Sequence, residues 1–307
     1  MMTSFERLAA ALNGEQPDRI PVSVWFHFGS EHLSPEMVAD LHEAYCLEYR
    51  WDFLKVMFDY RLDLPVGFDG QARPQIEVPL SEMDWNAPFR RQQICLEILQ
   101  ERLGGHTPLF ETVYSPWMYL LRHVGYDRRS DLLANPGLAA EVSSRISDAV
   151  SKHLQAIRRI GIYGIFFATT VGDVHTGPDE AVQQAKTDML VLAEAEGLAR
   201  ILHLHGTKTD LARARDYPHE VLHCEDCDPG NPGLAELRKA TRGAVMGGLP
   251  YRTITRLSPS GIQQAVAKAM DAAGRRGLIL APGCSVSPSV SGRTLRGIRD
   301  SAHLANG

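Results

Sequence analysis

The sequence has few cysteines, no long hydrophobic run and no strong excess of charge. Five cysteines in 307 residues, an odd number, argue against a secreted protein held together by disulfide bonds. No apolar run approaches the ~18 residues of a membrane span, and the stretch MMTSFERLAAALNGEQPDR lacks the apolar segment of a signal peptide. A net charge of −5 does not favour binding to nucleic acid or to a membrane surface. We therefore expect a cytoplasmic protein that acts on a small molecule.

Two nucleotide-binding motifs are also missing. No G-x-G-x-x-G follows the first predicted strand, and no P-loop is present. The chain instead has a hydrophobic content of 44% and eight short runs that are mostly apolar, which is typical of buried parallel strands. The predicted strands are Ile20–Phe26, Phe53–Phe58, Leu109–Tyr114, Gly164–Ala168, Leu202–Leu204, Val221–His223, Ala244–Gly247 and Leu278–Ala281.

The stretches between these runs carry helix signals. A Ser-Pro or Asn-Pro pair precedes three amphipathic segments, at residues 34, 135 and 258, and Gly161 and Gly274 end two of them. Eight strands alternating with helices predict a single α/β domain over residues 1–307, a (β/α)8 or TIM barrel. A doubly wound open sheet is the alternative. The stretch Asp59–Pro108 is expected to be a long excursion over the mouth of the barrel.

Histidine and cysteine gather where the predicted strands end, which is where a barrel places its active site. His203 and His205 lie two positions apart on an extended segment, so both rings point the same way. Together with Cys284, at the end of the eighth strand, they form a candidate zinc site with three protein ligands. The alternative is that each histidine caps a strand and that Cys284 is a small buried hydrophobe.

Two further motifs carry weaker signals. HCEDC, residues 223–227, contains one C-x-x-C, but a structural zinc site needs a partner pair that the chain does not have. The simplest interpretation is that HCEDC has a structural role. The alternative is that one of its residues supplements the metal site. DVHTG, residues 173–177, comes near the D-x-H-x-x-G of corrinoid-binding modules, but its glycine is one residue too early. We interpret it as a loop that faces the barrel mouth.

Motifs along nearly the whole chain resemble the uroporphyrinogen decarboxylase (URO-D) superfamily. The opening ERLAAALNGEQPDRIPVSVW is similar to its N-terminal signature, and WDFLKVMFDY to its second-strand segment. YSPWMYLLRHVG resembles its proline-aromatic loop. ILHLHG, VMGGL and GLILAPGCSVSPSVSGRTLRGIRDSAH follow in the family's order and spacing. The resemblance implies a (β/α)8 barrel and suggests a homodimer.

The resemblance to the haem-pathway decarboxylase of this superfamily is incomplete. Phe26 and Ser30 stand where that decarboxylase has two arginines that meet substrate carboxylates. Arg122 stands in place of a loop tyrosine, and Cys284 in place of a histidine. Only the catalytic aspartate persists, as Asp59. These differences argue against decarboxylation of a tetrapyrrole.

The other branch consists of zinc-dependent methyl- and alkyltransferases that act with corrinoid proteins or thiol coenzymes. Its mark is H-x-C followed much later by Gly-Cys. His203 matches the first ligand and Cys284 the last, while His205 replaces the middle cysteine. This replacement keeps a zinc ligand but removes the negative charge of a thiolate, so zinc would be a stronger Lewis acid and its bound thiolate a weaker nucleophile.

The resemblance therefore predicts a methyl- or alkyltransferase that uses zinc and a corrinoid carried by a partner protein. In that hypothesis Asp59 binds or orients substrate, and His27, Tyr114 and His175 are candidate substrate-binding residues. For each of these four, hydrogen bonding within a strand-end loop is the alternative. A decarboxylase acting on a smaller carboxylic acid and a barrel that binds a ligand without catalysis are the alternative functions.

Overall fold

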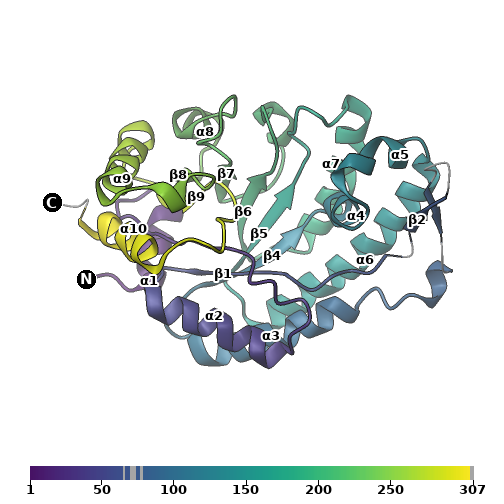
Figure 1. The fold of residues 1–307 in the computed structure, drawn as a ribbon, viewed down its shortest axis with the longest axis horizontal. Helices are drawn as coiled ribbons and strands as arrows, with labels where there is room; N and C mark the ends of the chain where they lie inside the picture. The colour runs from purple at the N-terminus through teal and green to yellow at the C-terminus, as the bar shows by residue number, and fades with distance from the viewer. Residues whose placement is uncertain (65, 70–73, 77–78, 305–307) are drawn as a thin grey trace.

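The computed structural model describes residues 1–64, 66–69, 74–76 and 79–304. Seven parallel strands form one curled sheet in the order β1-β4-β5-β6-β7-β8-β9, and the helices lie outside it (Figure 1). A separate hairpin pairs β2 with β3. The strands are β1 Leu54–Val56, β2 Val66–Phe68, β3 Pro74–Ile76, β4 Leu109–Tyr114, β5 Gly164–Thr169, β6 Ala199–Leu204, β7 Val221–Cys224, β8 Ala244–Leu249 and β9 Leu278–Pro282.

The helices begin where the sequence predicts them. Ser34 and Ser258 accept hydrogen bonds from backbone N–H groups in the first turn of α2 and α9, and Asn135 does the same for α6. A proline follows each cap. Its missing N–H costs no hydrogen bond there, because the N–H at the first helical position has no partner within the helix. The α-helices are α1 Ser4–Leu12, α2 Pro35–Tyr49, α3 Ala87–Leu103, α4 Pro116–Val124, α5 Arg129–Leu133, α6 Pro136–Ile160, α7 Pro178–Ala193, α8 Leu234–Ala240, α9 Pro259–Ala273 and α10 Gly292–Leu304. Among the described residues, no helix is both long and apolar enough to cross a membrane.

Seven of the eight predicted strands are present in the curled sheet, and their order is the chain order of a barrel. β4 has the predicted bounds, whereas β6 begins three residues earlier than predicted, at Ala199. The sequence reasoning missed this start because Arg200 is polar. In the fold, Glu220 binds the guanidinium and the backbone N–H of Arg200, so a charged residue can occupy a strand.

The first predicted strand, Ile20–Phe26, is wrong as a strand and forms a single bridge at Val22. Pro21 lacks an N–H donor, which limits the ladder that this segment can form. Its backbone nevertheless bonds in two directions: Pro21 O accepts from Leu280 N at 2.8 Å, and Val22 O accepts from Asp52 N at 3.0 Å. The segment therefore links β9 to the residues just before β1.

The predicted excursion Asp59–Pro108 is also wrong in its second half. α3 occupies Ala87–Leu103 and packs between α2 and α6 in the outer layer of helices. Its buried face includes Phe89, Leu96 and Leu99. Only the residues before α3 leave the barrel, with the β2–β3 hairpin among them, and part of this stretch lies outside the described residues.

Aromatic rings fill the interior of the curled sheet. Trp25, from the segment beside β9, packs edge-on against Phe166 of β5 and His223 of β7, with ring centroids 5.3 and 5.8 Å apart. His203 of β6 packs on Phe166 and on His223 in turn. This layer of rings is the floor on which the candidate site lies.

Candidate metal centre at the strand ends

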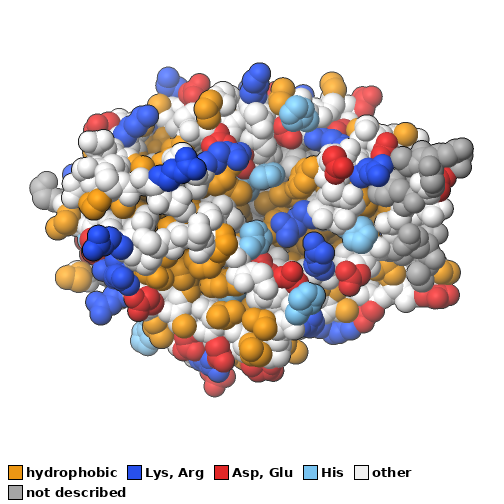
Figure 2. All heavy atoms as spheres, viewed as in Figure 1, with side chains coloured by type: hydrophobic (Ala, Val, Ile, Leu, Met, Phe, Trp, Pro, Cys, Tyr) orange, Lys and Arg blue, Asp and Glu red, His pale blue; other side chains and the backbone are white. Residues whose placement is uncertain are grey.

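Four side chains that ligate metals converge at one end of the sheet. His203, His205, Glu225 and Cys284 each offer one ligand atom, and these atoms all lie within 4.8 Å of one another. We call this set the four-donor cluster. Three of its members are the predicted zinc ligands, which the fold brings together from β6 and from the loop after β9. Figure 2 shows histidine and basic side chains around a hollow at the centre of this face of the molecule.

The strand register explains why Glu225 joins the cluster. His203 lies opposite His223 in the parallel pair β6–β7. Two residues further on, where side chains return to the same face, His205 therefore lies beside Glu225. Sequence reasoning considered the histidine and cysteines of HCEDC and missed this glutamate. The two-residue alternation of the paired strands is the signal that could have found it.

A backbone N–H and a close backbone contact hold Glu225 of the cluster in place. The Gly206 N–H donates to Glu225 Oε2 at 3.0 Å, while Oε1 lies 2.7 Å from His205 Nδ1. Gly283 lies against the same segment, and a Cβ atom there would be 2.8 Å from Glu225 Cα. A glycine before Cys284 is therefore required for the loop after β9 to approach Glu225 this closely.

The two histidines of the cluster have opposite electrostatic environments. Burial, together with the neighbouring His223 and His205, lowers the pKa of His203 well below its ordinary value, so its ring is neutral and can donate a lone pair. Burial also opposes the charged form of His205, but Cys284 and Glu225 outweigh it and raise its pKa to about 10. A metal ion bound here would displace that proton.

Unpartnered polar atoms indicate that the cluster is built for a ligand. Nδ1 of His203 and Nδ1 of His205 are buried without a hydrogen-bond partner among the described residues. The short approach of His205 to Glu225 lacks the angle of a hydrogen bond. Tetrahedral zinc, with ligand bonds of about 2.0–2.3 Å, separates its donors by roughly 3.3–3.8 Å. Two imidazoles, a thiol and a carboxylate within 4.8 Å therefore fit one zinc ion after small side-chain rotations.

Asp59 and His27 form a pair at the same end of the sheet. Asp59 Oδ1 lies 2.6 Å from His27 Nδ1, and Oδ2 accepts bonds from the backbone N–H of Phe28 and from the N–H and hydroxyl of Ser30. Burial favours the neutral acid, but the contacts with His27 and Ser30 prevail and hold the pKa of Asp59 well below its usual range. Both oxygens of Asp59 thus face the loop 27–30, and the half-exposed His27 ring is what this pair presents to solvent.

Tyr114 and His175, the other predicted substrate-binding residues, have different surroundings. Tyr114 ends β4 and is buried, with the Arg122 guanidinium stacked over its ring at 4.1 Å from the centroid. Arg122 is exposed, and among the described residues no carboxylate pairs with it. His175 is exposed in the loop after β5, where its backbone N–H donates to Asp173. Neither Tyr114 nor His175 belongs to the four-donor cluster.

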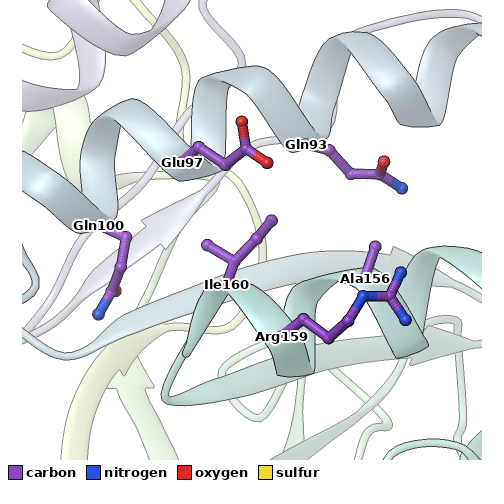
Figure 3. Close-up of a pocket in the computed structure, with 6 residues that line it drawn as sticks. All are labelled: Gln93, Glu97, Gln100, Ala156, Arg159 and Ile160. Carbon is purple, nitrogen blue, oxygen red and sulfur yellow. The ribbon is translucent and has the colours of Figure 1, made fainter.

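A second hollow lies outside the curled sheet, between α3 and α6 (Figure 3). It has a volume of about 350 Å³ and is lined by Gln93, Glu97, Gln100, Ala156, Arg159 and Ile160. It contains none of the predicted site residues, and neither histidine nor cysteine lines it. We place the chemistry of the protein at the strand ends.

Comparison with known proteins identifies the family of the chain. The family model described as Uroporphyrinogen decarboxylase (URO-D) matches residues 3–304, so the chain belongs to this family. The resemblance inferred from the sequence motifs is thereby confirmed. No curated protein sequence matches the chain.

Solved structures share the fold at low sequence identity. A methyltransferase from Methanosarcina mazei is 17% identical, with a TM-score of 0.78 and both chains covered completely. A B12-independent methionine synthase from Shewanella sp. W3-18-1, in complex with selenomethionine, is 12% identical over 95% of this chain and 94% of that one, with a TM-score of 0.60. A putative vitamin-B12 independent methionine synthase from Listeria monocytogenes is 15% identical over 94% and 96%, with a TM-score of 0.56. Identities this low establish the fold alone.

Proposed function

We propose that the protein is a zinc-dependent methyl- or alkyltransferase that moves a methyl group between a corrinoid protein and a thiol. The observation that carries this proposal is the four-donor cluster, whose donor atoms lie within 4.8 Å at the strand ends of the fold. The likeness to a methyltransferase and to two methionine synthases supports it. We also propose that Ile20–Phe26 completes an eight-stranded barrel, because it bonds to β9 and to the residue before β1.

In this proposal His203, His205 and Cys284 would hold zinc, and Glu225 would be a fourth donor that a substrate thiolate replaces. Zinc supplies Lewis-acid chemistry, which lowers the pKa of a bound thiol toward neutrality. His205, where a cysteine is expected, supplies a neutral nitrogen in place of a thiolate. The ligand set then has one thiolate and one carboxylate, and its combined charge equals that of a set with two thiolates and no carboxylate.

The remaining predicted site residues have roles at the mouth of the barrel. We propose that Asp59 orients His27, since both of its oxygens are bound by loop 27–30, and that His27, Tyr114 and His175 contact substrate. A small-molecule thiol and a corrinoid protein are the proposed partners. Homodimerisation and a cytoplasmic location remain predictions from the sequence.

Methyl transfer from free methylcobalamin to 2-mercaptoethanol tests the proposal. Zinc-loaded protein is expected to consume methylcobalamin, seen by its absorbance, and to form the methyl thioether, seen by mass spectrometry. Cys284→Ser is expected to reduce the rate at least about 100-fold, because it removes a donor. Cys227→Ser is the matched control, since Cys227 is exposed and outside the four-donor cluster.

Other outcomes would contradict the proposal. Release of carbon dioxide from a small carboxylic acid by zinc-free protein would establish the decarboxylase alternative. Tight binding of methylcobalamin without turnover, in protein shown to carry zinc, would favour a barrel that binds its ligand without catalysis.

A further inference from the structure

Lys55 is a buried amine that the proposed zinc site does not use. It lies on β1 with 4% of its surface exposed, and its side chain enters the ring layer inside the sheet. Its Nζ atom lies 4.3 Å from the centroid of the Phe166 ring and 5.4 Å from that of Trp25. His203, a member of the four-donor cluster, packs on the same Phe166 ring. One aromatic ring thus contacts both the amine and a proposed zinc ligand.

The surroundings of Lys55 do not suit a permanent ammonium ion. Among the described residues its only hydrogen-bond acceptor is Met57 Sδ at 3.2 Å, and no carboxylate forms an ion pair with it. An ammonium group has three donors and is normally paired when it is buried. Lys55 has a thioether and two aromatic ring faces as neighbours instead of a carboxylate. These neighbours leave most of the free-energy cost of desolvating an ammonium charge uncompensated.

Titratable groups on β4, on α4 and in the loops after β1 and β9 act on this amine. Burial is the largest influence and lowers the pKa of Lys55 to about 7, while Cys284, Glu111 and Asp59 raise it and Arg122 lowers it. Lys55 in turn lowers the pKa of the two interior histidines, His203 and His223. Among the groups that raise the pKa of Lys55, Cys284, a member of the four-donor cluster, has the largest effect. A divalent cation held by the cluster would favour the neutral amine further, since like charges repel.

We propose that the Lys55 amine is the internal base that accepts the proton released when a substrate thiol binds at the four-donor cluster. The S–H bond breaks and an N–H bond forms, so thiol and amine become thiolate and ammonium. The electron pair stays on sulfur, where it is available to attack the methyl group. The ammonium later returns its proton to solvent. This role rests on the proposed function, because it requires a thiol at the cluster.

The first test counts the protons that leave the protein when the thiol binds. Zinc-loaded protein is titrated with 2-mercaptoethanol at pH 7.5 by calorimetry, in buffers of different ionisation enthalpy. Lys55→Met is expected to release close to one proton per bound thiol, and wild-type protein measurably fewer, because Lys55 retains part of the released proton. Lys152→Met, at an exposed position on α6, is the matched control and is expected to behave as wild type.

The second test needs neither a variant nor a metal. The ¹³Cε resonance of Lys55 in zinc-free wild-type protein is expected to titrate with a midpoint near pH 7, whereas an ordinary lysine titrates near pH 10.4. A midpoint above about 9 would overturn the proposal, because the amine would then be charged and unable to accept a proton at neutral pH. This result holds whether or not Lys55→Met folds.

The two proposals fail in different ways. Equal proton release from wild type and Lys55→Met, with the thiol still bound and methylated, would refute the role of Lys55 and leave the transferase intact. A zinc-loaded wild type that binds no thiol would refute the transferase itself. If both stand, Lys55→Met is expected to slow methyl transfer by about 10²–10⁴-fold near pH 7.5 and to remove the loss of rate that wild type shows as the pH falls through 7.

Discussion

Two regions of this protein contain the same residue types and differ in whether their polar atoms are paired. Between β4 and the outer helices, Glu111 accepts from Gln92 at 2.8 Å and lies 3.0 Å from His153 Nε2, and His153 Nδ1 lies 3.2 Å from Gln93. Both the glutamate and the histidine of this network are fully buried, and each polar atom of their two side chains has a partner. In the four-donor cluster Nδ1 of His203 lacks a partner among the described residues, and Nδ1 of His205 has only its ion-pair contact with Glu225, which lacks hydrogen-bond geometry.

The comparison shows how a buried histidine–glutamate pair can be assigned to structure or to chemistry. The Glu111–His153 pair, whose own polar atoms are all bonded, has no free lone pair for a ligand, and its contribution is to the stability and specificity of the fold. A cluster with orphaned donors loses stability unless something binds there. The Glu111 network lies behind the sheet, whereas the cluster lies at the strand ends, where a barrel places its active site.

The largest expected effect comes from breaking the paired network. His153→Ala leaves the Glu111 carboxylate buried without its imidazole partner, so the free energy of unfolding is expected to fall by about 3–5 kcal/mol in a urea titration. Zinc affinity should not change, because neither residue belongs to the four-donor cluster. A variant that kept its stability but lost zinc would reverse the two assignments.

The corresponding change in the cluster is Glu225→Gln. It is expected to weaken zinc binding about 10–100-fold, measured by competition with a chelator, because a neutral amide replaces an anionic donor. The free energy of unfolding of the zinc-free protein is expected to fall by about 1–3 kcal/mol, because the amide can still accept the Gly206 N–H but no longer pairs with the His205 charge. Glu111→Gln is the matched control and should leave zinc affinity unchanged.

Gly283→Ala tests the close approach that completes the cluster. The added Cβ atom would lie 2.8 Å from Glu225 Cα, so one of the two segments must shift. We expect a loss of about 1–3 kcal/mol of stability, as for other overpacked sites, together with weaker zinc binding. Gly137→Ala, on α6, adds a methyl group with nothing within 4 Å and should reduce neither quantity. Unchanged zinc affinity in Gly283→Ala would show that this contact does not position the donors.

Asp188 is a third buried acid, and only one of its two carboxylate oxygens is hydrogen-bonded within the described part of the chain. Its Oδ2 accepts from Thr169 and Tyr217, while its Oδ1 has no partner among the described residues. Burial raises its pKa to about 7 despite these two hydrogen bonds. Between about pH 4 and pH 7 the folded protein therefore holds a proton that the unfolded chain has lost, and the stability from this group declines as the pH rises.

Asp188→Asn, compared with wild type in urea titrations across that pH range, isolates this effect. Wild type is expected to lose stability relative to the variant by at most about 1.4 kcal/mol per pH unit, the value for one proton. A difference between the two proteins that does not vary with pH would mean that Asp188 is ionised throughout.

Local patterns were enough to predict most of the fold. The Ser-Pro and Asn-Pro pairs specify helix starts that depend only on nearby atoms, and the apolar runs specify seven of the eight predicted strands. The segment Ile20–Phe26 could not be predicted in the same way, because whether it pairs depends on neighbours from both ends of the chain. α3 was missed because its polar residues, such as Gln92, are satisfied only by distant partners.

The candidate site was predictable only where one segment carries the signal. His203 lies on β6 and His205 directly after it, so one short segment carries both, and Cys284 follows from the resemblance. Glu225 required the register between β6 and β7, which no single segment specifies. Lys55 appeared in the sequence as one polar residue in an apolar strand, and its position among the rings depends on segments from across the barrel.

The zinc content of the purified, untagged protein tests the central claim most directly. Elemental analysis is expected to find about one zinc per chain in wild type and almost none in His203→Ala or Cys284→Ser, with His153→Ala retaining its metal. Folded wild-type protein that contains no zinc and takes up none when it is offered would contradict the account.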